Sequence, residues 1–277
     1  MNPTELEVPA RDGFVLHARR YGDGEHVVLI NSATAVPQHY YRHFATFLAN
    51  AGLCVFTYDY RGIGKSRPKS LRGFDATALD WVTQDMAGMI DWIHASHAPN
   101  SLHMGGHSIG GQLAGLLDNA DDIDSMVTMS AQSGHWRLQG AEQKLVVAMH
   151  VHVTLPVFAR GLGYVPWSWV GAEDLPAGVA RQWARWCRDP RYLLGDPTLP
   201  IERYSAFKAP VLAYSIDDDK WGTPQAVDAM MSAYPNVERK HLIPAELGLN
   251  AIAHFGFFKP AASVLWSDVV TWIKARS

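Results

Sequence analysis

A serine flanked by glycines stands between a strand-like and a helix-like segment of this chain. Gly106 and Gly110 bracket Ser108 in the pattern G-x-S-x-G; residues 101–104 before it read as a strand, and 111–117 after it as a helix. A serine on such a sharp turn is held in a strained backbone conformation with its hydroxyl exposed above the sheet. Glycines are needed on both sides because a Cβ there would collide with the neighbouring strand and helix. Ser108 is therefore a candidate nucleophile.

Strand-like and helix-like segments alternate through the first half of the chain and again near its end. Continuous apolar runs such as 26–31 and 54–58 are typical of strands buried on both faces. Strands are expected at 14–21, 26–31, 54–58, 101–104, 125–130, 210–215 and 237–243, and helices at 38–50, 75–94, 111–117, 223–234 and 261–276. Alternating β and α units predict an α/β fold whose mostly parallel central sheet is flanked by helices.

The stretch 131–208 breaks this alternation. It holds five of the ten tryptophans, and its apolar, helix-like run 145–162 is interrupted by Pro156. The simplest interpretation is one α/β core, formed by 1–130 and 209–277, with 131–208 inserted as a helical cap. The aromatic content favours an apolar substrate pocket under the cap. Alternatively, the tryptophans only fix the cap to the core.

A serine hydroxyl is a weak nucleophile and needs an oriented general base. In a sheet of this kind the partners follow later strands in the order Ser, acid, His. Asp219 stands at the end of the strand expected at 210–215, with Asp218 as the alternative acid, and His254 follows the last strand. We expect His254 to take the proton of Ser108, and the acid to orient its imidazole. The acidic cluster could instead be a solvated turn that caps the next helix.

Stabilising the negative charge that develops during such a reaction requires two backbone amides, the oxyanion hole. One is expected from Ile109, the residue after the nucleophile. The other is expected from the loop after the 26–31 strand, where Ala33 is the first candidate and Thr34 the second. The same loop could also be a plain strand-to-helix connection.

Residues 59–66, Asp-Tyr-Arg-Gly-Ile-Gly-Lys-Ser, match the pattern D-x-R-G-x-G-x-S, and with this motif the chain resembles the α/β-hydrolase superfamily over nearly its whole length. The resemblance implies the α/β-hydrolase fold and structural roles for Asp59 and Arg61. The superfamily normally has His-Gly where this chain has Asn31-Ser32, at the start of the loop expected to carry the second amide.

The chain is more closely similar to bacterial hydrolases of esterase-like and serine-aminopeptidase-like kinds, which share the 58–62 run and the His-x-Gly-Phe-Phe ending at 254–258. Because the central residue of the G-x-S-x-G turn is a serine, the branches of the superfamily that use an aspartate nucleophile are excluded. The resemblance implies hydrolysis of a carboxylic ester through an acyl-enzyme, and the apolar cap favours a small to medium hydrophobic substrate.

Three alternatives to an esterase stay open. A peptidase or amidase of the serine-aminopeptidase type would need a cap carboxylate to hold a substrate ammonium, and Glu142, Glu173 and Asp174 are available. Acyl transfer to an acceptor other than water is the second alternative. A non-catalytic ligand-binding protein is the third, although such a protein has no need of all three triad residues.

Composition limits the partners of the chain. The net charge of −3 and scattered basic residues argue against nucleic acid. With only two cysteines, Cys54 and Cys187, no disulfide framework is expected and a cytoplasmic location fits. His150 and His152 are spaced for different sides of a helix, so we expect no metal, and no cofactor. Neither a signal peptide nor an integral membrane segment is expected, so a small-molecule substrate is the one expected partner and the oligomeric state stays open.

Overall fold

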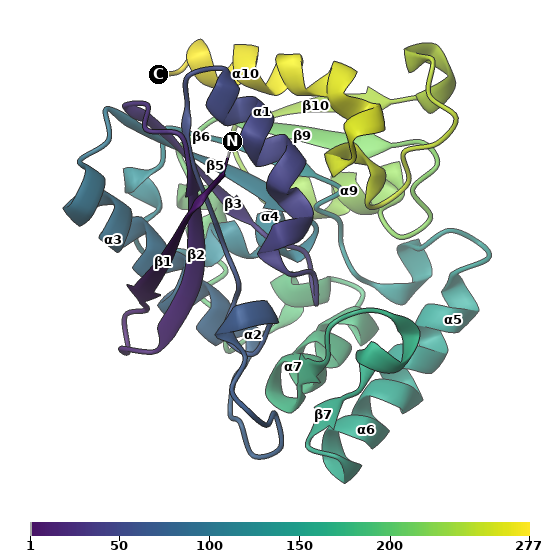
Figure 1. The fold of residues 1–277 in the computed structure, drawn as a ribbon. Helices are drawn as coiled ribbons and strands as arrows, with labels where there is room; N and C mark the ends of the chain where they lie inside the picture. Colours follow the sequence, from purple (N-terminus) through teal and green to yellow (C-terminus); the bar gives the residue numbers. More distant parts are fainter. Residues whose placement is uncertain (1) are drawn as a thin grey trace.

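The computed structural model describes residues 2–277 (Figure 1). Eight strands form one sheet in the order β1–β2–β4–β3–β5–β6–β9–β10. They are β1 (Thr4–Pro9), β2 (Val15–Tyr21), β3 (His26–Asn31), β4 (Cys54–Tyr58), β5 (Ser101–His107), β6 (Ser125–Met129), β9 (Val211–Ile216) and β10 (Val237–Leu242). Pairing is antiparallel for β1–β2 and β2–β4 and parallel for every other neighbouring pair. The predicted α/β fold with a mostly parallel sheet is confirmed.

Helices cover both faces of this sheet. On one face α1 (Arg42–Asn50) and α10 (Trp266–Lys274) lie side by side and share an apolar cluster with the sheet (Figure 1). On the other face α3 (Ala87–His97), α4 (Ile109–Gln112) and α9 (Pro224–Met231) contribute to a second and larger cluster. Burial on both faces explains why the central strands are continuous apolar runs in the sequence.

Three features of the backbone differ from the predicted elements. Strand β1 is not predicted, because it is an edge strand in which only Val8 is buried, so that no apolar run marks it. The helix expected from residue 75 begins as α2 (Ala78–Asp80) after a capping box, in which Thr77 and Asp80 each accept the other's amide. It then passes through a π-helical turn at Trp81–Met86 before α3.

The segment expected as a cap leaves the sheet between the neighbouring strands β6 and β9. It contains α5 (Lys144–Met149), α6 (Leu155–Gly161), α7 (Ala177–Arg188), α8 (Arg203–Ala206) and the short pair β7 (Tyr164–Val165) and β8 (Leu175–Pro176). In Figure 1, α5, α6, α7 and β7 lie together at the end of the molecule away from α10. The expected interruption is a π-helical turn at His150–Thr154, which directly precedes α6 and its Pro156, a residue with no amide to donate to the preceding turn.

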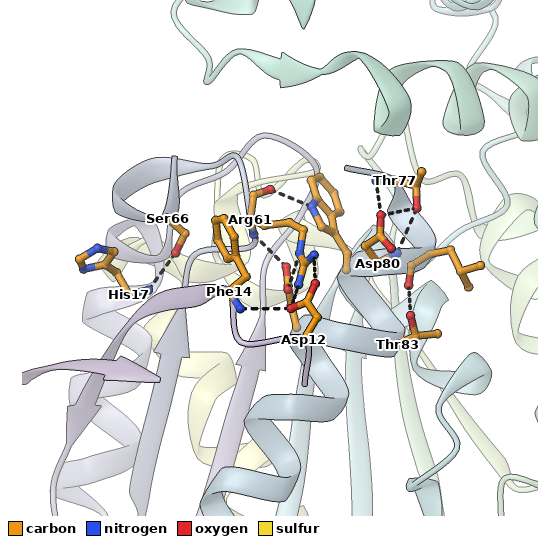
Figure 2. A network of polar contacts seen from close by, with 11 residues as sticks. Asp12, Phe14, His17, Arg61, Ser66, Thr77, Asp80 and Thr83 are labelled. Carbon is orange, nitrogen blue, oxygen red and sulfur yellow. Dashed lines mark hydrogen bonds and ion pairs between the residues drawn. The ribbon is translucent and has the colours of Figure 1, made fainter. Parts of the chain in front are cut away.

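Charged side chains tie down the turn that follows β4. The Arg61 guanidinium donates to Asp12 at 2.7 and 2.8 Å (Figure 2) and to the buried Asp85 at 2.7 Å. Asp59 accepts the backbone amides of Gln38 at 2.7 Å and Lys65 at 3.0 Å. These contacts fit the structural role that the superfamily resemblance implies for both residues.

Candidate active site

Ser108 lies on a sharp turn between β5 and α4. Its φ of 52° and ψ of −119° are strained for a residue with a side chain. A Cβ on Gly106 would lie 2.5 Å from the Cα of Gly111, and a Cβ on Gly110 would overlap the carbonyl oxygen of Asn31. The glycine pattern is thus required by close packing of α4 against β5 and β3, and it leaves the serine at the carboxyl end of the sheet.

Asp219 and His254 meet at the same end of the sheet. Asp219 follows β9, and its carboxylate lies 2.8 Å from Nδ1 of His254, on the loop after β10. The other carboxylate oxygen of Asp219 accepts the amides of Trp221 at 2.9 Å and Gly222 at 2.8 Å. Both side chains of the acid–imidazole pair are buried. The carboxylate therefore holds the imidazole with Nδ1 protonated and Nε2 free to accept a proton.

The neighbouring carboxylate, Asp218, does something different. It accepts the backbone amides of Ile252 at 3.0 Å and Ala253 at 2.8 Å. Ala253 has a positive φ of 50°, so the backbone just before His254 is held in an unfavourable conformation. Asp219 is thus hydrogen-bonded to the imidazole of His254, and Asp218 to the backbone of the loop that carries it.

The charge state of Asp219 suits an orienting role. Burial alone would raise the pKa of this carboxyl, but the charge and hydrogen bond of His254 and the amide of Gly222 lower it to about 2. The carboxylate is therefore ionised throughout the neutral pH range, and it can stabilise a positive imidazolium beside it.

Ser108 and His254 line one cavity, although no hydrogen bond joins their side chains. Such contacts are often long in ligand-free sites and tighten when substrate binds. The three residues expected as a triad thus come from loops after β5, β9 and β10, which lie at the same edge of the sheet.

In the loop after β3, the structure does not favour the residue expected first as the oxyanion donor. The amide of Ala33, the first candidate, donates to the hydroxyl of Tyr41 at 2.8 Å and is occupied. Among residues 2–277 the amides of Thr34 and Ile109 make no backbone hydrogen bond, and both residues line a small pocket of about 30 Å³ beside Ser108. The geometry therefore favours Thr34, the second candidate, together with Ile109.

Two residues that the sequence patterns do not single out connect the parts of this site. The Tyr41 hydroxyl, which accepts from Ala33, lies 2.9 Å from Nδ1 of His107, and Nε2 of His107 lies 2.9 Å from the carbonyl oxygen of His254. Because a carbonyl only accepts, Nε2 of His107 carries the proton and Nδ1 accepts from Tyr41. Burial lowers the pKa of the His107 imidazole to about 3, so this ring is neutral.

Replacement of Tyr41 by phenylalanine is expected to lower kcat with little change in KM. The buried amide of Ala33 and Nδ1 of His107 would both lose their partner, at a cost of about 1–3 kcal/mol for each unsatisfied group. Steady-state kinetics and thermal unfolding measure the two effects. Tyr40→Phe is the matched control, because the Tyr40 hydroxyl bonds only to the exposed Phe255 backbone. A rise in kcat of Tyr41→Phe would instead identify the freed Ala33 amide as the oxyanion donor.

An apolar cavity of about 320 Å³ opens above Ser108. The segment 131–208 contributes part of its wall, and the loops at the carboxyl ends of the strands contribute the rest. The lining residues are Ala33, Thr34, Ala35, Val36, Ser108, Gln132, Val147, His150, Val151, Trp167, Val170, Ala172, Trp183, Trp221, His254 and Phe255. Of the five tryptophans in 131–208, Trp167 and Trp183 thus face the cavity, whereas Trp186 is buried and donates to Asp196 at 2.7 Å. Trp167 and Trp183 thus fit the predicted apolar pocket, whereas the hydrogen bond of Trp186 lies within the segment 131–208 itself.

Carboxylates are absent from the cavity wall within the described chain. Glu142 pairs with Lys220, and Asp174 pairs with Arg67 at 2.8 Å. Neither of them, nor Glu173, lines the cavity, so none is placed to hold a substrate ammonium there. Nor do residues 2–277 bring three or more His, Cys, Asp or Glu together in an arrangement that could hold a metal ion. In the same part of the chain, every helix is too short or too polar to cross a membrane.

The fold and the residues at the strand ends define the class of the α/β-hydrolases. Within that class, the model of the family described as serine aminopeptidase, S33 (Hydrolase_4) matches residues 25–184, and the chain belongs to this family. The resemblance inferred from the sequence motifs is therefore confirmed.

Solved structures of similar fold cover nearly the whole chain. A soluble variant of the monoglyceride lipase from Saccharomyces cerevisiae, in complex with a substrate analog, has a TM-score of 0.69 and 14% identity and covers 100% of this chain and 97% of its own. The esterase EaEST from Exiguobacterium antarcticum has a TM-score of 0.66 and 16% identity, and the match covers 98% of this chain and 100% of EaEST. Est1E from Butyrivibrio proteoclasticus with ferulic acid bound has a TM-score of 0.65 and 17% identity, and the match covers 98% of each chain. No curated protein sequence matches the chain. At these identities the likeness establishes the fold alone.

Proposed function

We propose that this chain is a carboxylesterase that acts on small to medium hydrophobic esters through an acyl-enzyme. The observation that carries the proposal is the carboxylate-free, largely apolar cavity into which Ser108 and His254 open. Such a wall favours burial of an apolar acyl or alcohol group and offers no partner for a charged amine. In this proposal 131–208 acts as a cap that completes the pocket over a core of 1–130 and 209–277.

The reaction begins when Oγ of Ser108 attacks the ester carbonyl carbon while Nε2 of His254 takes the hydroxyl proton. Asp219 stabilises the resulting imidazolium, and the amides of Thr34 and Ile109 donate to the oxyanion of the tetrahedral intermediate. The intermediate collapses as the C–O bond to the alcohol breaks and His254 returns the proton to the leaving oxygen. Water then attacks the acyl carbon while His254 takes its proton. The bond from that carbon to Oγ of Ser108 breaks, and His254 returns the proton to Oγ, which releases the carboxylic acid and regenerates the serine.

The similar structures support ester chemistry over amide chemistry, since those named above include an esterase and a monoglyceride lipase. The family's description as a serine aminopeptidase favours the opposite choice. The position of Glu142, Glu173 and Asp174 outside the cavity is the reason for preferring an ester. A cytoplasmic location stays a prediction, and the two cysteines, both free and buried, are compatible with it.

Hydrolysis of p-nitrophenyl esters from acetate to decanoate tests the proposal. We expect kcat/KM to rise with chain length until the cavity is full, by at most about fourfold per buried methylene. Trp183→Ala, which enlarges the cavity, should move the preferred length upward, whereas Trp169→Ala, whose side chain lies outside the cavity wall, should leave it unchanged. A flat profile, or faster cleavage of aminoacyl p-nitroanilides, would contradict an apolar esterase.

A further inference from the structure

A row of large apolar side chains on the cap is exposed. Relative exposure is 79% for Leu145, 49% for Val146, 58% for Met149, 48% for Val153 and 58% for Val157. Four of them recur every four residues along the helical stretch from α5 through the π-helical turn to α6, so they lie on one side of it. Contiguous exposed patches of this kind mark interaction sites. We call these five residues the apolar row.

The opposite side of the same helical stretch faces the site. Val147 and Val151 are buried and line the substrate cavity. Nearby, Val170 lines the cavity too and is 80% exposed, and its neighbour Trp169 is 71% exposed. Trp169 and Val170 thus form an apolar edge that connects the cavity with the outside surface of the cap. The same cap segment also carries the apolar row.

The charged residues within the helical stretch of the apolar row are positive, and Glu142, three residues before Leu145, is paired with Lys220. Between residues 144 and 161 the chain has Lys144 and Arg160 and no acidic residue. Across from Arg160, helix α7 presents Arg181, Arg185 and Arg188, and all four arginines line one hollow of about 470 Å³ between α6 and α7. Within residues 2–277 only Arg185 among these has a carboxylate partner, Asp196. The hollow contains no acidic lining residue, so it is suited to anionic groups.

We propose that the apolar row and the arginine hollow together form a docking surface for an anionic lipid layer. An apolar helix face that inserts at the acyl boundary, flanked by cations that meet lipid phosphates, is the arrangement that interfacial helices use. A second copy of the chain is a poorer occupant, because face-to-face packing would oppose like-charged guanidinium groups. Docking would place the edge at Trp169 and Val170 against the lipid. That a substrate would enter the cavity past this edge rests on the proposed esterase function, whereas docking itself does not.

Sedimentation of the full chain with vesicles tests the docking surface. We expect binding to phosphatidylcholine vesicles containing about 30% phosphatidylglycerol, and much weaker binding to phosphatidylcholine alone. Leu145→Gln with Met149→Gln should weaken binding at least tenfold. Val264→Gln is the control, since Val264 is 62% exposed but lies outside the cap. Arg181→Gln with Arg188→Gln should weaken binding by about thirtyfold, and Arg191→Gln, exposed on the cap outside the hollow, should not.

The variants are first shown to be folded by their unchanged rate on the water-soluble p-nitrophenyl acetate, or by circular dichroism and thermal unfolding if no ester is cleaved. Equal vesicle binding by wild type and both double variants would overturn the proposal, and so would equal binding to neutral and anionic vesicles. A dimer in sedimentation velocity that Leu145→Gln with Met149→Gln dissociates would instead assign the surface to a second copy. Vesicle binding is measured without turnover, so a failed docking proposal and a failed esterase proposal give different results.

Discussion

Replacement of Ser108 by alanine is expected to lower kcat for ester hydrolysis by about 10⁶-fold. Without Oγ no acyl-enzyme forms, and His254 has no hydroxyl proton to take. The remaining oxyanion donors and the cavity still bind substrate, so we expect a small change in KM. The fold should persist, because alanine meets the same backbone strain as serine at a φ of 52°.

Covalent labelling by a fluorophosphonate probe tests the role of Ser108 without a known substrate. Wild type should be labelled once per chain, and Ser108→Ala should not be labelled. Ser133→Ala is a matched control, because Ser133 is also buried and its hydroxyl accepts only a long bond of 3.4 Å from the amide of His135. Labelling that persists in Ser108→Ala would place the nucleophile elsewhere. Absence of labelling in folded wild type would favour a ligand-binding protein.

Replacement of Asp219 by asparagine is expected to lower kcat by about 10⁴-fold. An asparagine can present its amide nitrogen to Nδ1 of His254 and so favour the wrong tautomer, and it carries no charge to stabilise the imidazolium. Because the pKa of Asp219 is lowered to about 2, its carboxylate is ionised at every pH from about 4 upward. The loss should therefore be present across the neutral range, which a kcat profile against pH can verify.

Asp218→Asn is the comparison that separates the two adjacent aspartates. The new side chain can accept only one of the two amides, Ile252 or Ala253, that the carboxylate now accepts. We expect a loss in kcat of about tenfold, since a single hydrogen bond to a charged carboxylate is worth about 1.5–3 kcal/mol. A severe loss in Asp218→Asn with a nearly silent Asp219→Asn would reverse the assignment of the acid.

Much of the fold could be predicted because most of the sheet is parallel and buried on both faces. Strands such as 26–31 and 54–58 have the same bounds in the structure as in the apolar pattern. Strand β1 escaped prediction because it lies at the edge, and an edge strand does not need two apolar faces. The π-helical turns were not predicted, because the spacing of apolar side chains does not reveal a single extra residue in one turn of a helix.

The site could be predicted in part for a similar reason. Chain order after successive strands is enough to bring Ser108, Asp219 and His254 to one edge, because parallel strands end together. Which amide serves the oxyanion depends instead on where the Tyr41 hydroxyl points, and no local pattern encodes that contact with Ala33. The contact of His107 with the His254 carbonyl likewise joins residues 147 positions apart.

The hydrogen bond from His107 to the His254 carbonyl joins two separate segments of the candidate site. His107 is the last residue of β5 and directly precedes Ser108, so one side chain joins the end of this strand to the backbone of His254. Since burial lowers the pKa of His107 to about 3, this ring stays neutral in the proposed mechanism, in which the neighbouring His254 gains and loses a proton. A neutral hydrogen bond, rather than an ion pair, therefore fixes the backbone of His254 relative to the turn that carries Ser108.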